Sequence, residues 1–546
     1  MLRLAAALAL ASTTGAAAAQ EDAAAVNARL AAPLPADQAA MKAHVLFLAS
    51  DAMRGREAGS AEFDIAAQYV AAQFYAAGLR PRGDAGGYLQ RVPLVTYRLE
   101  GAGSIAWAPR GGTAQSLIPG DDFQASANPA RALTRVAAPV LFLGWGMDAA
   151  GFGHDDYRGV NVRGRIVAVV QGAPAGLGGE ERAFFQSTAT KAAAAARHGA
   201  VGLIVVSTRQ AAAPAGGTPR PPARAAVARM TWANPDGTGH GDGVPVLGTL
   251  TAAGAAKLFG ADWARVTAAA TTTTPRYPTL RANGTLTVET RTGFTPGASS
   301  NVVGIIPGSD PALRDQVVVL SAHLDHIGVR TDGEGDRINN GALDNAIGIA
   351  SLIEEAKRFT GSGRPPKRTL MFLAVTGEEK GLVGSDYFTS HPTVPLGRIV
   401  ADVNLDMPIL TYRFEDMIVY GADRTTLGPI VRRAVEQVGV TMSPDPAPEQ
   451  GIFVRSDHFR FVQKGIPAVF LWPGQKGPGK AAFDAFMGRC YHRPCDELAQ
   501  QPVLWDQGVR FVDVNYRIAR EVADGAARPV WNRGDYFARL YGGVTG

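Results

Sequence analysis

Short apolar runs alternate with longer amphipathic segments along the second half of the chain. The apolar runs are mostly aliphatic and each has the length of one strand: "NVVGII", "QVVVLSAH", "TLMFLAV", "IVADVNL", "MIVYG" and "IPAVFLW". Helix-like segments lie between or after them, among them "GALDNAIGIASLIEEAKRF", "LGPIVRRAVEQVG" and "QGVRFVDVNYRIAREVADG". Near-continuous apolar strands that alternate with helices are typical of parallel sheets covered on both faces. The pattern therefore predicts an α/β fold whose mixed, largely parallel sheet is flanked by helices.

The first half of the chain has a different pattern. Residues 36–80 predict helices, because their apolar positions recur close to every 3.6 residues. From about residue 130, strand candidates bounded by glycine dominate: "APVLFLGWG", "GRIVAVVQG" and "AVGLIVVS". Residues 208–228 are rich in proline, alanine and arginine and predict a mobile loop. A Thr/Pro-rich stretch near residues 267–278 predicts a domain boundary.

The opening residues "MLRLAAALALASTTGAAAAQED" have the features of a signal peptide. A positive Arg3 precedes a short apolar core, and Ala17 and Ala19 form an A-x-A cleavage pattern. The apolar core is too short to span a bilayer, and no later run reaches that length, so no transmembrane segment is expected. We expect export to the periplasm or the medium; the alternative is an alanine-rich helix that stays in the cytoplasm. The expected divisions are a signal peptide at 1–19, the N-terminal part of the main domain at 20–130, a smaller β-rich insert at 131–290 and the main domain at 291–546.

The amino-acid composition excludes only a few classes of protein. With 46% hydrophobic and 19% charged residues, the 546-residue chain is long enough for more than one ordinary globular core. Its 54 basic and 49 acidic side chains leave a formal charge of +5 without a dense basic run, which argues against nucleic acid as a partner. Two cysteines, Cys490 and Cys495, lack the C-x-x-C spacing of a zinc site. In an exported protein we expect them to form a disulfide around His492.

Polar side chains capable of binding a metal gather where the predicted strands end, which is where open α/β sheets hold their ligands. Each alone is consistent with an ordinary structural residue. Together they comprise two imidazoles and several carboxylates: His323, Asp325, Asp344, Glu378, Glu379, Asp406 and His492.

Nitrogen and oxygen donors in this combination suit two zinc ions, with one carboxylate bridging them. Asp325 lies two residues after His323, and we expect it to accept the second ring N–H of that histidine. Of the adjacent Glu378 and Glu379, one is expected to ligate and the other to take a proton from bound water.

At these residues the chain resembles the M28 family of zinc peptidases, which includes co-catalytic aminopeptidases. The resemblance rests on motifs in a fixed order: "AHLDH", "GALDNAIG", "GEEKGLVGS", "NLDM", "SDHFRFVQKGIP" and "YHRPCDE". It covers roughly residues 299–525, and "LASDAMRGREAGS" near the N-terminus is also similar to the family's opening segment. The resemblance implies the zinc-exopeptidase fold, also described as phosphorylase/hydrolase-like.

The resemblance also implies a role for each residue. One zinc would be held by His323 and Asp406, and the other by Glu379 and His492. Asp344 would bridge the two ions, Glu378 would be the general base, and Asp325 would support His323. His458, in "SDHFRF", would contact the substrate or its oxyanion. Many relatives carry a tyrosine shortly before that motif, but Phe453 and Val454 stand there in this chain, so no tyrosine donor is expected at that position.

Residues 131–290 resemble a protease-associated (PA) domain. The resemblance rests on "DDYRGVNVRGRIVAVVQGAP" followed by "KAAAAARHGAVGLIVVS". In relatives this domain is non-catalytic and is thought to shape substrate access. The alternative is a β-rich insertion of another purpose.

Several other residues are assigned no catalytic role. His326 is expected to pack beside the metal site without ligating. The remaining histidines have no metal-like neighbours and are interpreted as surface or structural residues: His44, His154, His198, His240 and His391. The chain has no G-x-S-x-G motif, which excludes the usual serine hydrolase pattern.

The sequence thus predicts an exported metallopeptidase with two zinc ions, most simply an aminopeptidase acting on peptides. A carboxypeptidase-type M28 enzyme remains an alternative, because these residues do not determine which end of the peptide is cleaved. The complete set of five ligands disfavours a mono-zinc cyclase. A non-catalytic binding or receptor-like relative is also an alternative, although such proteins usually lose ligands and none is missing here.

Overall fold

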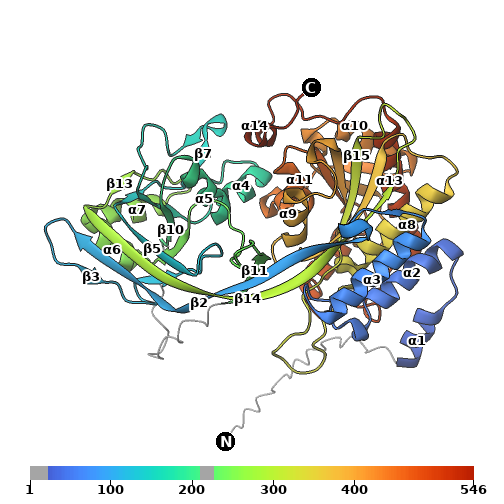
Figure 1. The fold of residues 1–546 in the computed structure, drawn as a ribbon, viewed down its shortest axis with the longest axis horizontal. Coiled ribbons are helices and arrows are strands. Elements are labelled where there is room, and N and C mark those ends of the chain that lie inside the picture. The colour runs from blue at the N-terminus through green and yellow to red at the C-terminus, as the bar shows by residue number, and fades with distance from the viewer. Residues whose placement is uncertain (1–22, 209–226) are drawn as a thin grey trace, which may run out of the picture.

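The computed structural model describes residues 23–208 and 227–546. The predicted signal peptide, and most of the loop predicted at residues 208–228, lie outside these residues. Figure 1 shows two parts joined by a pair of long strands, with the N-terminal helices packed on the part that also contains the chain's second half.

The main part is built on a twelve-stranded sheet with the order β11-β2-β14-β16-β15-β17-β20-β18-β19 along its main path. Its central strands run parallel to one another: β16 (Thr369–Val375), β15 (Val317–His323), β17 (Ile399–Asn404) and β20 (Ala468–Pro473). The strands on either side run antiparallel to their neighbours in the centre: β14 (Gly284–Ile306) beside β16 and β18 (Asp416–Tyr420) beside β20. This confirms the predicted mixed sheet with a parallel centre.

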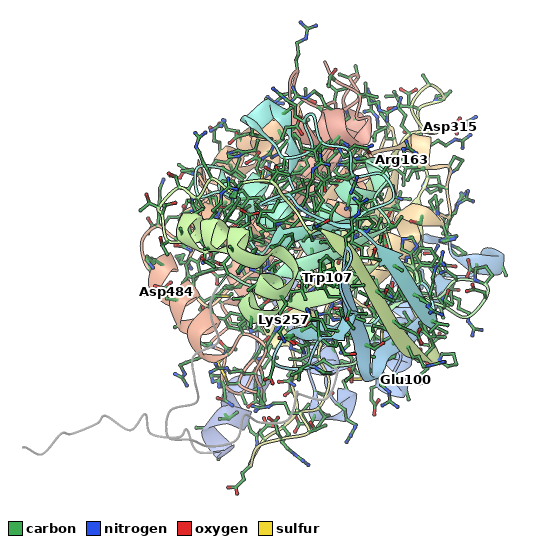
Figure 2. All side chains as sticks on the ribbon, turned by 90° about the vertical axis from the view of Figure 1, so that its left-hand side faces the viewer. Glu100, Trp107, Arg163, Lys257, Asp315 and Asp484 are labelled. Carbon is green, nitrogen blue, oxygen red and sulfur yellow. A yellow bond between two sulfur atoms is a disulfide. The ribbon has the colours of Figure 1, made fainter. Side chains whose placement is uncertain are left out.

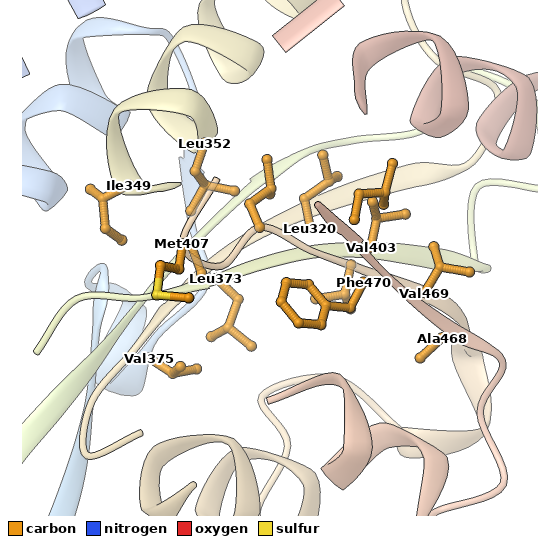
Figure 3. Close-up of a cluster of buried hydrophobic side chains, with 14 of the residues drawn as sticks. Leu320, Ile349, Leu352, Leu373, Val375, Val403, Met407, Ala468, Val469 and Phe470 are labelled. Atoms are coloured by element: carbon orange, nitrogen blue, oxygen red, sulfur yellow. The ribbon is translucent and has the colours of Figure 1, made fainter. Parts of the chain in front are cut away.

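Helices cover both faces of this sheet. One layer contains four helices, of which the last contacts the other three: α2 (Ala36–Leu48), α8 (Ile347–Gly361), α10 (Leu427–Gln437) and α13 (Trp505–Asp524). The other face carries α9 (Val383–Ser390) and α11 (His458–Val462). Figure 3 shows Ile349 and Leu352 of α8 above Leu320 and Val403 of the sheet. All residues of the parallel strands are buried, which explains why their sequences are mostly apolar, with Ser321, Asp402 and Asn404 among the exceptions.

Two long strands carry the chain from the sheet into the insert. They are β2 (Leu89–Pro109) and β14, which pair with each other in antiparallel register along almost their whole length. Of these two strands only the end of β14, the predicted "NVVGII" at residues 301–306, was expected. The rest of β14 and all of β2 were not predicted, although Leu286, Val288, Thr290 and Thr292 are buried at alternate positions in β14, a period typical of a strand. Because the strands span both parts, they tie the insert to the main sheet.

The insert has a six-stranded sheet of its own. In spatial order its strands are β13 (Leu280–Arg281), β6 (Val140–Phe142), β9 (Ile166–Val170), β10 (Gly202–Val206), β12 (Val246–Leu250) and β4 (Phe123–Ala125). Helices α5 (Thr188–Arg197), α6 (Ala252–Phe259) and α7 (Trp263–Ala270) accompany it, so the insert is mixed α/β rather than only β-rich. Figure 2 views this end of the molecule and labels Trp107 of β2 and Lys257 of α6. The amine of Lys257 lies 2.6 Å from the carboxylate of Asp122.

Within the two described ranges, no helix combines the length and the apolarity needed to cross a bilayer.

Candidate metal centre

The carboxyl ends of the parallel strands bring the predicted metal-binding side chains together. His323 is the last residue of β15, Asp406 follows β17, and Glu378 and Glu379 follow β16. Asp344 lies in the turn Ala342–Ala346 that leads into α8. Adjacent parallel strands end at the same edge of the sheet, so residues far apart in the sequence meet there.

A first group of donors surrounds His323. Its Nε2 lies 3.1 Å from Asp406 Oδ1 and 3.3 Å from Asp344 Oδ1. The three side chains are buried and their donor atoms lie close enough together to hold one metal ion. One imidazole and two carboxylates are a common zinc-binding set.

A second group lies on the other side of Asp344. His492 Nε2 is 3.2 Å from Asp344 Oδ2 and 3.1 Å from Glu379 Oε2. Asp344 therefore directs one oxygen toward each group. The disulfide between Cys490 and Cys495, which the sequence predicted, closes the short loop that carries His492.

His326 is closer to this second group than the sequence suggested. It is completely buried, and its Nδ1 lies 2.7 Å from Glu379 Oε1 without the alignment of a hydrogen bond. As in the first group, the donor atoms lie close enough together to hold one metal ion; here they belong to His326, Asp344 and Glu379. The geometry therefore offers two imidazoles, His326 and His492, beside Glu379.

The donor set fits divalent metal ions on electrostatic grounds. Asp344, Glu379 and Asp406 have side-chain exposures of 5%, 4% and 13% and lie within a few ångströms of the same imidazoles. Buried carboxylates that lack cationic partners carry a large desolvation penalty. Two divalent cations would offset this penalty, and oxygen with imidazole nitrogen is the chemistry that zinc accepts.

The site strongly perturbs its titratable groups. Burial opposes protonation of His323, but Asp406 and Asp344 outweigh it and raise the pKa of His323 well above its ordinary value. Burial raises the pKa of the Glu378 carboxyl well above its usual range. Perturbations of this kind concentrate at functional sites.

Asp325 supports the site through a contact different from the one predicted. His323 Nδ1 lies 3.1 Å from the main-chain carbonyl of Asp325, not from its carboxylate. The Asp325 carboxylate instead accepts the backbone N–H groups of Glu378 and Glu379, at 3.1 and 3.3 Å. The side chain points toward the neighbouring strand end, so it fixes the backbone that carries both glutamates.

Asn345 joins two of the loops that carry donors. Its side-chain NH₂ donates to the carbonyl of Leu405 at 2.9 Å, and its Oδ1 accepts the N–H of Met407 at 3.0 Å. Asp406 lies between these two residues, so the amide of Asn345 holds the backbone on both sides of it. Ser456 donates its hydroxyl to Asp406 Oδ2 at 2.5 Å and orients the carboxylate itself.

Asp496 joins the loop of His492 to that of Asp344. Its carboxylate accepts the backbone N–H groups of Leu343 and Asp344, at 2.8 and 3.0 Å. The residue follows Cys495 directly and is completely buried. It belongs to the motif "YHRPCDE", but the sequence predicted no role for it.

Arg56 is a further residue that the sequence interpretation missed. It is completely buried and donates to the carbonyls of Leu324, Gly341 and Asp344, at 2.7, 2.7 and 3.3 Å. It also donates to the carbonyls of Leu48 and Asn340. Burial lowers its pKa only to about 10, so the guanidinium is charged at neutral pH. Its position between two loops that carry donors could not be read from "MRGREAGS" alone.

Four of the donors, His323, Asp344, Asp406 and His492, line a pocket that also has an apolar wall. Its wall includes Ile452, Phe470, Trp472 and Met487, and Glu378 faces it from the metal side. Arg455 and Tyr491 also line it. Burial raises the pKa of Tyr491 above its ordinary value, so its hydroxyl remains a donor. Tyr491 directly precedes His492, and that adjacency is the signal that would have identified it.

His458 does not line this pocket. It is completely buried in α11, with its ring between those of Phe453 and Phe470 at centroid distances of 5.3 and 5.4 Å. Burial lowers its pKa to about 3, so the imidazole is neutral. The structure therefore does not bring His458 together with the other predicted site residues.

Comparison with known proteins finds similarity to peptidases. Residues 301–514 match the model of peptidase family M28. The chain is 32% identical to leupeptin-inactivating enzyme 1 of Streptomyces exfoliatus over 231 residues, which is 40% of this chain and 47% of that protein. It is 30% identical to the probable leucine aminopeptidase 2 of Aspergillus oryzae over 187 residues, which is 32% of this chain and 34% of that protein.

Two solved structures align with this chain at lower sequence identity, with TM-scores below 0.5. An aminopeptidase from Aneurinibacillus sp. strain AM-1 aligns over 91% of this chain and 97% of its own, with 19% identity and a TM-score of 0.46. A zinc aminopeptidase from Bacillus subtilis aligns over 91% and 98%, with 19% identity and a TM-score of 0.44. The alignments to the two curated relatives span less than half of each relative's length. The segment from residue 301 to residue 514 is the part of the chain that matches family M28.

Replacing Arg56 with methionine should lower both the stability of the protein and the Zn²⁺ affinity of the candidate centre. The change leaves several buried carbonyls without donors, so we expect a loss of about 3 kcal/mol or more in the free energy of unfolding. Urea unfolding measures that loss, and competition with a chelator should show Zn²⁺ affinity reduced about 10- to 100-fold. Arg54→Met is the matched control, because the Arg54 side chain is 60% exposed and forms a surface ion pair with Glu62. Wild-type Zn²⁺ affinity in Arg56→Met would contradict the assigned role.

Proposed function

We propose that the protein is a zinc-dependent aminopeptidase. The observation that carries the proposal is the pair of donor groups sharing Asp344 beside an apolar pocket, within a family M28 domain. In this proposal His323 and Asp406 hold one zinc ion, Glu379 and His492 hold the other, and Asp344 bridges them. His326 lies against Glu379 and orients it.

Glu378 is the proposed general base. It faces the pocket and stands next to a ligand, and the Asp325 carboxylate holds the backbone of both glutamates. Bound zinc would supply Lewis acidity for the scissile carbonyl and would lower the pKa of water. Glu378 takes the proton of the attacking water and returns it to the leaving amine. Tyr491, protonated and in the pocket wall, is placed to donate a hydrogen bond to the developing oxyanion.

The pocket favours an apolar N-terminal side chain. Ile452, Phe470, Trp472 and Met487 form a wall that an aliphatic or aromatic residue would cover. The curated relatives agree with this preference, since one is described as a probable leucine aminopeptidase. We therefore propose peptides with a free amino group and an apolar first residue as substrates.

Export is part of the same proposal. The opening residues have the pattern of a signal peptide, and the Cys490–Cys495 disulfide suits an oxidising compartment. A periplasmic or secreted peptidase is consistent with both features.

Glu378→Gln should abolish turnover while leaving the metal in place. The amide keeps the shape of the side chain but cannot accept the proton, so we expect kcat to fall about 10³-fold. Hydrolysis of leucyl-p-nitroanilide and zinc content by mass spectrometry measure the two effects separately. Glu436→Gln, on the exposed face of α10, is the control. An active Glu378→Gln enzyme would exclude this residue as the base.

Replacing His492 and replacing His326 should have different effects on the zinc content of the protein. His492→Ala removes a proposed ligand and should retain close to one zinc ion per chain after dialysis. His326→Ala removes an orienting contact and should retain both ions, with affinity about 10- to 100-fold weaker. His154→Ala, in the insert, serves as the control. Loss of one full ion from His326→Ala would make His326 a ligand and overturn this division.

A further inference from the structure

Helix α4 (Gly179–Gln186) of the insert packs directly behind one wall of the pocket. It contacts the short turns Pro448–Gln450 and Ile452–Val454 of the main part. The second turn continues into Arg455, and both Ile452 and Arg455 line the pocket. The insert therefore reaches the candidate site through the back of this wall.

Two glycines allow an unusually close approach at this contact. A Cβ atom on Gly179 would lie 1.6 Å from the carbonyl oxygen of Pro448. A Cβ atom on Gly451 would lie 1.9 Å from the Cβ of Ala183 in α4. No side chain fits at either place without displacing backbone, so the helix and the 448–451 backbone fix each other's position.

A buried charge cluster holds the same helix. Arg424 of the main part lies 2.5 Å from both Glu180 Oε2 and Glu181 Oε1, and 2.9 Å from Asp535 Oδ2. The Arg424 side chain is only 15% exposed, and its guanidinium also lies over the ring of Phe453 at 5.2 Å from the centroid. Because Phe453 lies between Ile452 and Val454, the arginine connects α4 to the pocket wall.

An aromatic contact completes the attachment. Phe184 of α4 is 5% exposed, and its ring centroid lies 5.3 Å from that of Phe537 and 6.1 Å from that of Phe459. Steric, ionic and aromatic contacts thus converge on one helix of eight residues. Such a contact fixes geometry instead of permitting a hinge.

We propose that α4 of the insert determines the position of the Ile452–Arg455 wall and thereby the enzyme's selectivity for the first residue of its substrate. Gly179 and Arg424 are then positioning residues that act through this wall. The inference rests on the proposed aminopeptidase function, which supplies the substrate that the wall contacts.

Gly179→Ala tests the inference with one added methyl group. Gly176→Ala is the matched control, because Gly176 lies in the same segment and its added Cβ meets no atom within 4 Å. For leucyl-p-nitroanilide we expect KM to rise about tenfold in Gly179→Ala, with kcat within about twofold of wild type, since the weakened wall contacts stabilise the bound substrate and the transition state equally. The ratio of kcat/KM between leucyl and alanyl substrates should fall, and zinc content should not change. The double variant Glu180→Gln, Glu181→Gln should shift KM in the same direction if Gly179→Ala does not fold.

Amide hydrogen exchange of residues 448–456 provides a readout that does not depend on activity. Faster exchange there in Gly179→Ala, but not in Gly176→Ala, supports the inference. Unchanged exchange, or faster exchange with unchanged KM and selectivity, overturns it. A wild-type enzyme that binds zinc but cleaves no aminoacyl anilide would refute the proposed function instead, and the exchange comparison would still decide whether α4 holds the wall.

Discussion

The gathering of carboxylates at one buried edge of the sheet is the constraint on which the rest of the site depends. Asp344, Glu379 and Asp406 lie around shared imidazoles with little access to water. Their mutual repulsion would separate them unless cations and a rigid backbone opposed it. Arg56, Asn345 and Asp496 supply that rigidity by binding main-chain groups of the loops that carry the donors.

The supporting residues come from distant parts of the chain. Arg56 lies in the N-terminal segment, Asp325 follows the first parallel strand, and Asp496 follows the disulfide near the C-terminus. The side chain of each residue forms hydrogen bonds with backbone groups and not with the metal-binding side chains. The metal-binding side chains are thereby left free to face one another, which is the arrangement expected of a preorganised centre.

The parallel strands, the helices, the disulfide and the convergence of the donors could be predicted, because apolar periodicity and strand ends are local properties of the sequence. Strand β2 and all of β14 before the predicted "NVVGII" were missed because their alternation is broken by glycine and proline, as in "GFTPGASS". The partner of Asp325 was assigned by proximity in sequence, whereas its carboxylate binds backbone on the neighbouring strand. The contacts of Arg56 and of α4 form only through tertiary packing, so no local sequence pattern could predict them.

Anomalous diffraction at the zinc absorption edge from crystals of the purified protein tests the central claim most directly. The account predicts two anomalous peaks on either side of the Asp344 carboxylate, one bounded by His323 and Asp406 and the other by Glu379 and His492. A pair of fully occupied metal ions in this region is sufficient for the proposed chemistry. A single peak, or none at this edge of the sheet, would contradict the two-zinc centre and the aminopeptidase mechanism built on it.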